Sequence, residues 1–304
     1  MNLLSWNCRG LGNPQTVSFL KLLVKEKNPS MIFLMETKCG KGRLEEVRRI
    51  LGFESCLTVE SRGSAGGLAI LWKNNTKVSI YNYSRWHISA HVLNLVGDQT
   101  WLFTGFYGHP ETSRRRSSWE FLKELKPLDP TPWLCSGDFN ELTCQAEKVG
   151  GPPRPYRQME MFREALEWCS LNRLRIEGPM FTWTNNRNGI NHTKEMLDRA
   201  LGNPAWLQMF NNASCVVLPA VKSDHSPLNV CLDCKGNLGT SKARIFRFEA
   251  AWNLKERCNS TIKKGWGLAA PGISHTDRIT RRLRNCSSEL KKWNSAENRR
   301  SGIK

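Results

Sequence analysis

The chain has 304 residues, enough for one large domain or two small ones with a substantial core. Hydrophobic residues make up 39% of the sequence and aromatic residues 9%, a composition that excludes an intrinsically disordered protein. The sequence has no stretch of eighteen apolar residues and begins without a secretory signal, so we expect no membrane association. The eleven cysteines are scattered singly through apolar segments, as is typical of reduced thiols in an intracellular protein.

The formal net charge of +18 is concentrated near the C-terminus. Residues 235–304 contain seventeen Lys or Arg and five Asp or Glu, a net +12, which leaves +6 for the first 234 residues. This distribution favours a polyanionic partner, in the first place a nucleic acid. A solvated positive surface or an acidic protein partner remains the alternative.

Short apolar segments typical of β-strands recur through the first 233 residues. We expect strands at residues 3–7, 31–36, 67–72, 77–83, 87–95, 101–107, 132–138, 181–184, 196–201, 214–218 and 228–232. Helices are fewer, one beginning at Asn13-Pro14 and others at 117–125 and 158–171. Many strands with few interspersed helices predict an α/β fold, a four-layer α/β/β/α sandwich of two packed mixed sheets with outer helices.

The pattern changes after residue 233, so we expect a domain at 1–233 and a basic linker with a helical tail at 234–304. Residues 235–241 have the composition of a linker, and residues 245–252 mix basic and aromatic side chains. Ser274-His-Thr-Asp277 resembles a capping box, and apolar residues follow it at helical spacing. Such a tail could pack on the sandwich, dimerise or lead into a downstream module, and we favour the last.

Polar side chains interrupt the ends of the predicted core strands. They are Asn7, Glu36, Tyr107, Asp138 with Asn140, Asp198, and Asp224 with His225. Each alone is compatible with a turn, a cap or a surface ion pair. Strand ends on one rim of a sandwich gather in space, however, so their recurrence predicts one shared site.

Strand alternation suggests how these side chains are directed. In an extended segment Asp138 and Asn140 would project to the same side. Asp224 and His225 are neighbours and would point apart, so the carboxylate behind the imidazole should come from elsewhere in the chain.

Six segments occur in an order that resembles the endonuclease/exonuclease/phosphatase superfamily. They are Trp6-Asn7, Met35-Glu36-Thr37, Phe106-Tyr107-Gly108, Gly137-Asp138-Phe139-Asn140, Leu197-Asp198-Arg199 and Ser223-Asp224-His225. The amino-acid sequence resembles still more closely the endonuclease domain of plant LINE-type (non-LTR) retrotransposon proteins. The segments that suggest this are 6–12, 106–111, 181–184 and 197–201. Residues 246–252 look like the connector that precedes the reverse transcriptase in such elements, which implies a reverse transcriptase module downstream.

The resemblance implies a Mg²⁺-dependent phosphodiesterase, with Mn²⁺ as a substitute, that nicks DNA in the nucleus. Glu36, Asn7 and Asp224 would serve the metal, because Mg²⁺ prefers oxygen ligands.

The remaining residues would serve the chemistry. Asp138 would position or deprotonate the attacking water. Asn140 and Tyr107 would donate hydrogen bonds to the charge that develops on the phosphate. His225 would contact the scissile phosphate, with Asp198 as the carboxylate behind its ring.

Three positions depart from the family pattern. Arg9 stands where many relatives have a second acidic or amide group, Pro110 replaces an asparagine, and Met196 replaces a basic residue. These departures leave room for a catalytically weakened nucleic-acid-binding relic, while a phosphatase of small phosphoesters on the same fold is a further alternative.

Two basic stretches could border the rim and contact the DNA backbone. They are Arg114-Arg115-Arg116 and the pair Arg154 and Arg157. Such contacts would provide affinity and salt dependence rather than sequence preference. Simple solvation of these arginines is the alternative.

Overall fold

The computed structural model describes residues 1–61, 63, 65–94, 99–128, 130–233, 252, 255–268 and 275–300. The chain divides into two units, Met1–Gly236 and Asn237–Lys304. The expected linker at 235–241 and all but Trp252 of the basic and aromatic segment at 245–252 lie outside the described residues. Among the helices described, none combines the length and apolar character needed to cross a membrane.

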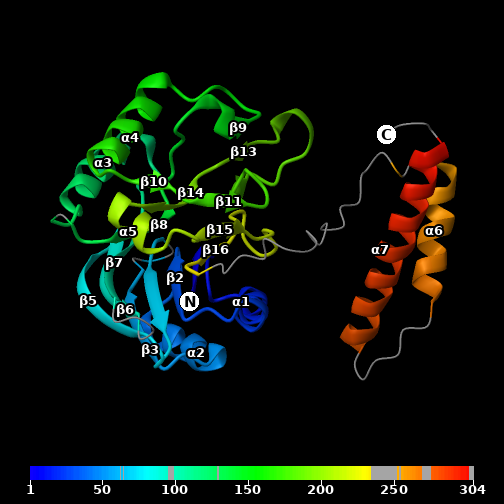
Figure 1. Ribbon diagram of the computed structural model, residues 1–304, viewed down its shortest axis with the longest axis horizontal. Coiled ribbons are helices and arrows are strands. Elements are labelled where there is room, and N and C mark those ends of the chain that lie inside the picture. Colours follow the sequence, from blue (N-terminus) through cyan, green and yellow to red (C-terminus); the bar gives the residue numbers. More distant parts are fainter. Residues whose placement is uncertain are drawn as a thin grey trace. The chain divides into compact units, whose positions relative to one another are not determined.

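Two large sheets form the centre of the first unit (Figure 1). The seven-stranded sheet has the order β11 (Arg175–Glu177), β15 (Ser214–Val217), β16 (Leu228–Cys231), β1 (Asn2–Asn7), β2 (Met31–Met35), β4 (Leu68–Trp72) and β3 (Ser55–Val59). The six-stranded sheet has the order β10 (Asn172–Arg173), β14 (Asp198–Gly202), β8 (Trp133–Asp138), β7 (Gln99–Tyr107), β6 (His87–Asn94) and β5 (Lys77–Ser84). A small third sheet joins β12 (Trp183–Thr184), β13 (Lys194–Glu195) and β9 (Lys148–Val149).

The inner faces of the two large sheets share one hydrophobic core. Phe33 of β2 and Phe103 of β7 meet edge to face, with ring centroids 5.9 Å apart. At Gly105 the sheets approach so closely that a Cβ atom would lie 2.4 Å from the Phe33 ring, which only glycine avoids. Strands such as β2 are therefore buried on both faces, which explains their continuous apolar sequence.

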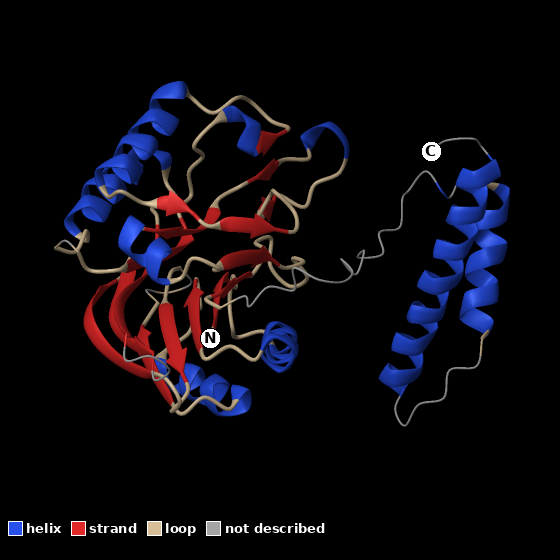
Figure 2. Ribbon diagram, viewed as in Figure 1, coloured by secondary structure: helices blue, strands red, loops and turns tan. Residues whose placement is uncertain are grey.

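Helices cover the outer faces of both sheets (Figure 2). On the seven-stranded sheet, α1 (Pro14–Lys27) and α2 (Lys41–Leu51) bury Leu20 and Leu44 in a second core cluster. On the six-stranded sheet, α3 (Arg115–Glu124) and α4 (Tyr156–Trp168) bury Trp119 and Phe162 in a third. This is the four-layer α/β/β/α sandwich that the sequence predicts. Short elements complete the unit: α5 (Pro204–Met209), η1 (Thr112–Arg114), η2 (Gln145–Glu147) and η3 (Gly189–Asn191).

Some elements differ from expectation. The predictions did not include β3, α2 or α5, and the strand expected at 181–184 is ordered as a strand only over β12. Helix α2 escapes recognition because only Leu44, Val47 and Leu51 among its eleven residues are buried, and charged side chains surround them. Its apolar stripe is too narrow to dominate the pattern.

The described part of the second unit contains two helices, α6 (Glu256–Gly267) and α7 (His275–Arg300). They pack through Cys258, Leu290 and the Trp252–Trp293 pair, whose ring centroids are 5.8 Å apart. The basic tail thus has a small apolar core of its own, formed with a helix that the sequence pattern did not reveal. The predicted cap residue Ser274 lies outside the described residues, and the helix begins at the next position.

Candidate active site

The ends of neighbouring strands bring the predicted polar residues together. In the parallel pair β1–β2, Asn7 lies opposite Met35, the residue before Glu36. In the parallel pair β7–β8, Tyr107 lies opposite Asp138. The antiparallel strand β14 then places Asp198 directly opposite Asp138. Both sheets therefore contribute to one cluster at the carboxyl ends of these four parallel strands.

His225 lies between two carboxylates of this cluster. Its Nδ1 is 2.9 Å from Asp198 Oδ2, and its Nε2 is 3.7 Å from Asp138 Oδ2. All three side chains are buried. Asp198 is held in place because the hydroxyl of Thr182 accepts hydrogen bonds from the backbone N–H groups of Leu197 and Asp198. The imidazole is thus oriented by Asp198 from one side and directed at Asp138 on the other.

The protonation of this trio follows from its burial and charge. Burial raises the pKa of Asp138 above its usual value, although the neighbouring His225 opposes the shift. Burial alone would lower the pKa of His225, but the carboxylates of Asp198 and Asp138 outweigh it and raise that pKa. Both shifts favour a proton held within the trio, as general acid–base chemistry requires.

Asn7 links this trio to Glu36. Its side-chain amide donates to Asp138 Oδ2 at 3.0 Å and, at a longer 3.4 Å, to Glu36 Oε1. The hydroxyl of Tyr107 also donates to Glu36 Oε1, at 2.8 Å. The carboxylate of Glu36 and the ring of His225 therefore belong to one connected cluster.

Two cations neutralise Glu36. Arg9 Nη1 lies 3.2 Å from its Oε1 and Lys38 Nζ lies 3.2 Å from its Oε2. Burial would raise the pKa of Glu36, but Arg9, the Tyr107 hydroxyl and Lys38 together lower it. Glu36 is consequently an ionised carboxylate at neutral pH.

Asp224 lies at the edge of the same cluster. The indole N–H of Trp183 donates to its Oδ2 at 3.0 Å, and Arg9 Nε is 3.3 Å from its Oδ1. The carboxylate that hydrogen-bonds to the His225 ring belongs to Asp198 and so comes from elsewhere in the chain, as expected.

Asn140 and Tyr107 are arranged differently from the sequence interpretation. Asn140 has a left-handed backbone (φ 55°), so the extended alternation assumed for residues 138–140 ends at Asp138. Its backbone N–H donates to Asp138 Oδ1 and its amide donates to the carbonyl of Gly108. Asn140 and Tyr107 thus hold the carboxylates and the adjoining loop in this structure.

The predicted DNA-contacting arginines fall into two groups. Arg115 and Arg154 are in internal ion pairs, Arg115 with Glu141 at 3.1 Å and Arg154 with Glu195 at 2.6 Å. Their side chains are only 10% and 14% exposed. Each of these two arginines neutralises a buried carboxylate, which leaves little of its side chain accessible for the predicted contact with DNA.

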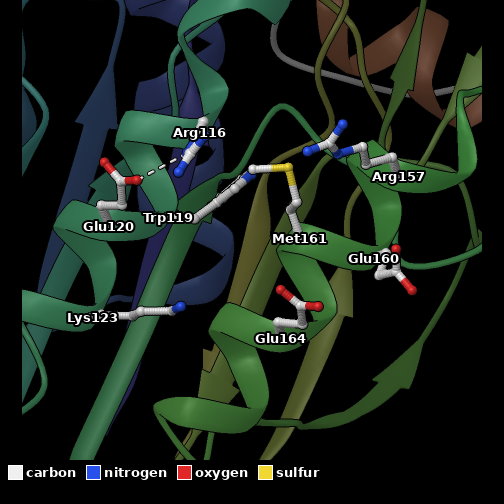
Figure 3. Close-up of a pocket in the computed structure, with 8 residues that line it drawn as sticks. All are labelled: Arg116, Trp119, Glu120, Lys123, Arg157, Glu160, Met161 and Glu164. Carbon is white, nitrogen blue, oxygen red and sulfur yellow. Dashed lines mark hydrogen bonds and ion pairs between the residues drawn. The ribbon is translucent and has the colours of Figure 1, made fainter.

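The other three arginines are exposed. Arg114 pairs with Glu111 and Arg116 with Glu120 on the surface. Arg116 and Arg157 line a cavity of about 310 Å³ between α3 and α4, together with Glu120, Glu160 and Glu164 (Figure 3). Acidic side chains offset the positive charge there, so these arginines form a weaker anion site than the sequence suggests.

Four residues that shape the site were not predicted from the sequence. Lys38 neutralises Glu36, Trp183 and Thr182 hold Asp224 and Asp198, and the hydroxyl of Ser223 donates to the Asn7 carbonyl at 2.8 Å. All four lie within or directly beside quoted motifs. Their position beside these motifs could have marked them as site residues. The sequence could not show which side chains they contact.

The comparisons with known proteins identify the family. The model of the Endonuclease/Exonuclease/phosphatase family matches residues 4–225. The chain belongs to this family. No curated protein matches the sequence significantly.

Solved structures of low sequence identity share the fold of this family member. A 3′-5′ exonuclease from Neisseria meningitidis gives a TM-score of 0.60 at 16% identity, over 77% of this chain and 100% of that one. An AP endonuclease from Archaeoglobus fulgidus gives 0.59 at 17% identity, over 77% and 99%. The endonuclease domain of TRAS1, a telomere-specific non-LTR retrotransposon, gives 0.55 at 13% identity, over 75% and 96%. At identities this low, the TM-scores show that these proteins share a fold with the chain.

The residues of this family member fit a divalent metal ion. Asp138, Asp198 and His225 each offer a ligand atom, all within 4.8 Å of one another. Beside them, Asn7 Oδ1 is buried without a hydrogen-bond partner among the described residues, and it belongs to the amide that contacts Glu36. Carboxylate and amide oxygens are the ligands that Mg²⁺ prefers. Asn7 and Glu36 thus add oxygen donors beside these three candidate ligands.

Proposed function

We propose that this protein is a Mg²⁺-dependent endonuclease that hydrolyses phosphodiester bonds in DNA and leaves a nick. The observation that carries the proposal is His225, held between Asp198 and Asp138 beside the Asn7–Glu36 pair. A basic imidazole, a buried carboxylate and a hard-oxygen metal site in one cluster match the needs of phosphodiester hydrolysis.

DNA is favoured as the substrate by charge and by fold. The net charge of +18 suits a polyanion. Proteins of the same fold include an AP endonuclease and a 3′ phosphatase bound to a product DNA hairpin. Arg114, Arg116 and Arg157 remain proposed backbone contacts.

The residues divide the chemistry as follows. Asp138, whose pKa is raised, accepts a proton from the attacking water or orients that water. His225 in its protonated form donates to the scissile phosphate, and Asp198 stabilises that form and fixes the ring orientation. Asn7 and Tyr107 hold the Glu36 carboxylate. When bound at Glu36, Asn7 and Asp224, Mg²⁺ (or Mn²⁺ in its place) would supply Lewis-acid stabilisation of the phosphoryl oxygens.

The origin of the chain is part of the proposal. The plant LINE-type resemblance rests on sequence segments such as 6–12 and 197–201, and the TRAS1 domain has the same fold. A retroelement endonuclease would act in the nucleus and would be followed by a reverse transcriptase module.

The full chain is expected to convert supercoiled plasmid to the relaxed form in Mg²⁺ and to leave it intact in EDTA, because the metal site is needed for the reaction. Gel electrophoresis of the plasmid measures this. A parallel assay measures phosphate released from inositol phosphates.

Two results would contradict the proposal. Phosphate release with an intact plasmid would indicate a phosphatase of small phosphoesters. Salt-sensitive DNA binding without cutting in Mg²⁺ or Mn²⁺ would indicate a nucleic-acid-binding relic.

A further inference from the structure

Arg9 joins the two carboxylates that are the proposed metal ligands. Its Nη1 is 3.2 Å from Glu36 Oε1 and its Nε is 3.3 Å from Asp224 Oδ1. Lys38 contacts Glu36 alone, at Oε2. A single planar guanidinium thus bridges two oxygens that come from distant parts of the sequence.

The backbone around this contact adopts an unusual conformation. Arg9, Glu36 and Lys38 all have left-handed φ values, of 53°, 49° and 51°. Residues with a Cβ atom rarely adopt this conformation, and it persists where the surrounding structure enforces it, often at functional sites. All three residues of the Arg9–Glu36–Lys38 ion pairs thus share this rare backbone conformation.

Arg9 differs from the carboxylates in its freedom to move. The Arg9 side chain is 44% exposed, while those of Glu36 and Asp224 are 9% and 19% exposed. An exposed arginine can leave an ion pair for solvent at small cost. The two carboxylates have other partners that fix them, Tyr107 and Asn7 for Glu36 and Trp183 for Asp224.

We propose that Arg9 is a displaceable counter-ion of the metal site. In the metal-free protein it neutralises Glu36 and Asp224, and a divalent cation must displace it to reach those oxygens. This inference rests on the proposed function in one respect, the assumption that the site binds a divalent metal ion. In this role Arg9 lowers the affinity of the site for the metal ion.

The test is Mn²⁺ binding to the full chain, measured by isothermal titration calorimetry on the parent and on Arg9→Gln. The neutral glutamine removes the competing charge, so Arg9→Gln is expected to bind Mn²⁺ about fivefold more tightly, the scale of a partly exposed ion pair. Arg175→Gln is the matched control, since Arg175 pairs with Glu177 on the surface and has a side chain 68% exposed. The control should bind Mn²⁺ like the parent.

Thermal unfolding with and without Mn²⁺ supplies a second readout, because replacement of a merely structural arginine would lower the melting temperature equally in both conditions. In EDTA, Arg9→Gln is expected to melt below the parent, because Glu36 and Asp224 lose their counter-ion. In saturating Mn²⁺ the difference should shrink or reverse, since binding and stability are linked.

Equal or weaker Mn²⁺ affinity of Arg9→Gln, or an equal melting deficit with and without Mn²⁺, would overturn the inference. Failure of both the parent and the variant to bind Mn²⁺ would contradict the proposed metal-dependent function as well. Normal binding that does not respond to Arg9 would overturn the inference alone.

Discussion

Asp198→Asn is expected to slow plasmid nicking by about 10²- to 10⁴-fold, the range of general acid–base effects. The Asp198 carboxylate lies 2.9 Å from His225 Nδ1 and raises the pKa of the ring. Asparagine keeps the shape but lacks the charge that stabilises the imidazolium, and it can present its amide to Nδ1. The rate is measured on supercoiled plasmid at saturating Mg²⁺.

The double variant Asp198→Asn with His225→Ala separates a shared role from two independent ones. If Asp198 acts through the imidazole, the double variant should be no slower than His225→Ala, since residues that act as a unit are non-additive. Melting temperatures check that each variant is folded. Independent, multiplicative losses would contradict the assignment of Asp198 as the positioning residue of His225.

Glu147→Ala is expected to lower the free energy of unfolding by about 3–5 kcal/mol, the cost of leaving a buried charge unpaired. Glu147 accepts two hydrogen bonds from the guanidinium of Arg199, and both side chains are almost fully buried. Arg199 follows Asp198 on β14, so this ion pair also supports the active site. The melting temperature should fall by about 6–20 °C, because 1 kcal/mol corresponds to about 2–4 °C in a domain of this size.

A surface pair provides the comparison for Glu147. Glu177→Ala removes an exposed partner of Arg175 and is expected to change stability by less than about 1 kcal/mol. The double variant Glu147→Leu with Arg199→Met should lose less stability than Glu147→Ala, because it removes both members of the buried pair. Arg173, which also lies 3.6 Å from Glu147, has a side chain that is 38% exposed and can be solvated. A fall of less than about 1 kcal/mol in the free energy of unfolding of Glu147→Ala would show that the buried ion pair is not needed for stability.

The fold could be predicted because sheet-on-sheet packing leaves a strong local signal. Continuous apolar segments such as Met31–Met35 identify strands covered on both faces. Polar residues that end those strands then suggest a rim. Helix α2 and strand β3 could not be found in this way, since the helix has a narrow apolar stripe and the strand is only half-buried at a sheet edge.

The sequence predicted which residues form the site better than it predicted the contacts between them. Local alternation suggested that the carboxylate behind His225 comes from a distant segment, and Asp198 lies there. It failed at Asn140, because a left-handed residue ends the extended geometry. The sequence also gave no indication that Arg115 and Arg154 form ion pairs with buried carboxylates. Such partners are distant in sequence, so they depend on the complete fold.

The carboxylate of Asp138 is central to the proposed active site, because it contacts Asn7 on one side and His225 on the other. The decisive measurement is relaxation of supercoiled plasmid in Mg²⁺ by the parent chain and by Asp138→Ala, purified in the same way. We predict that the parent nicks the plasmid and that the variant is slower by at least about 10²-fold. Equal relaxation by the two proteins would show that the activity does not come from this site and would contradict the account.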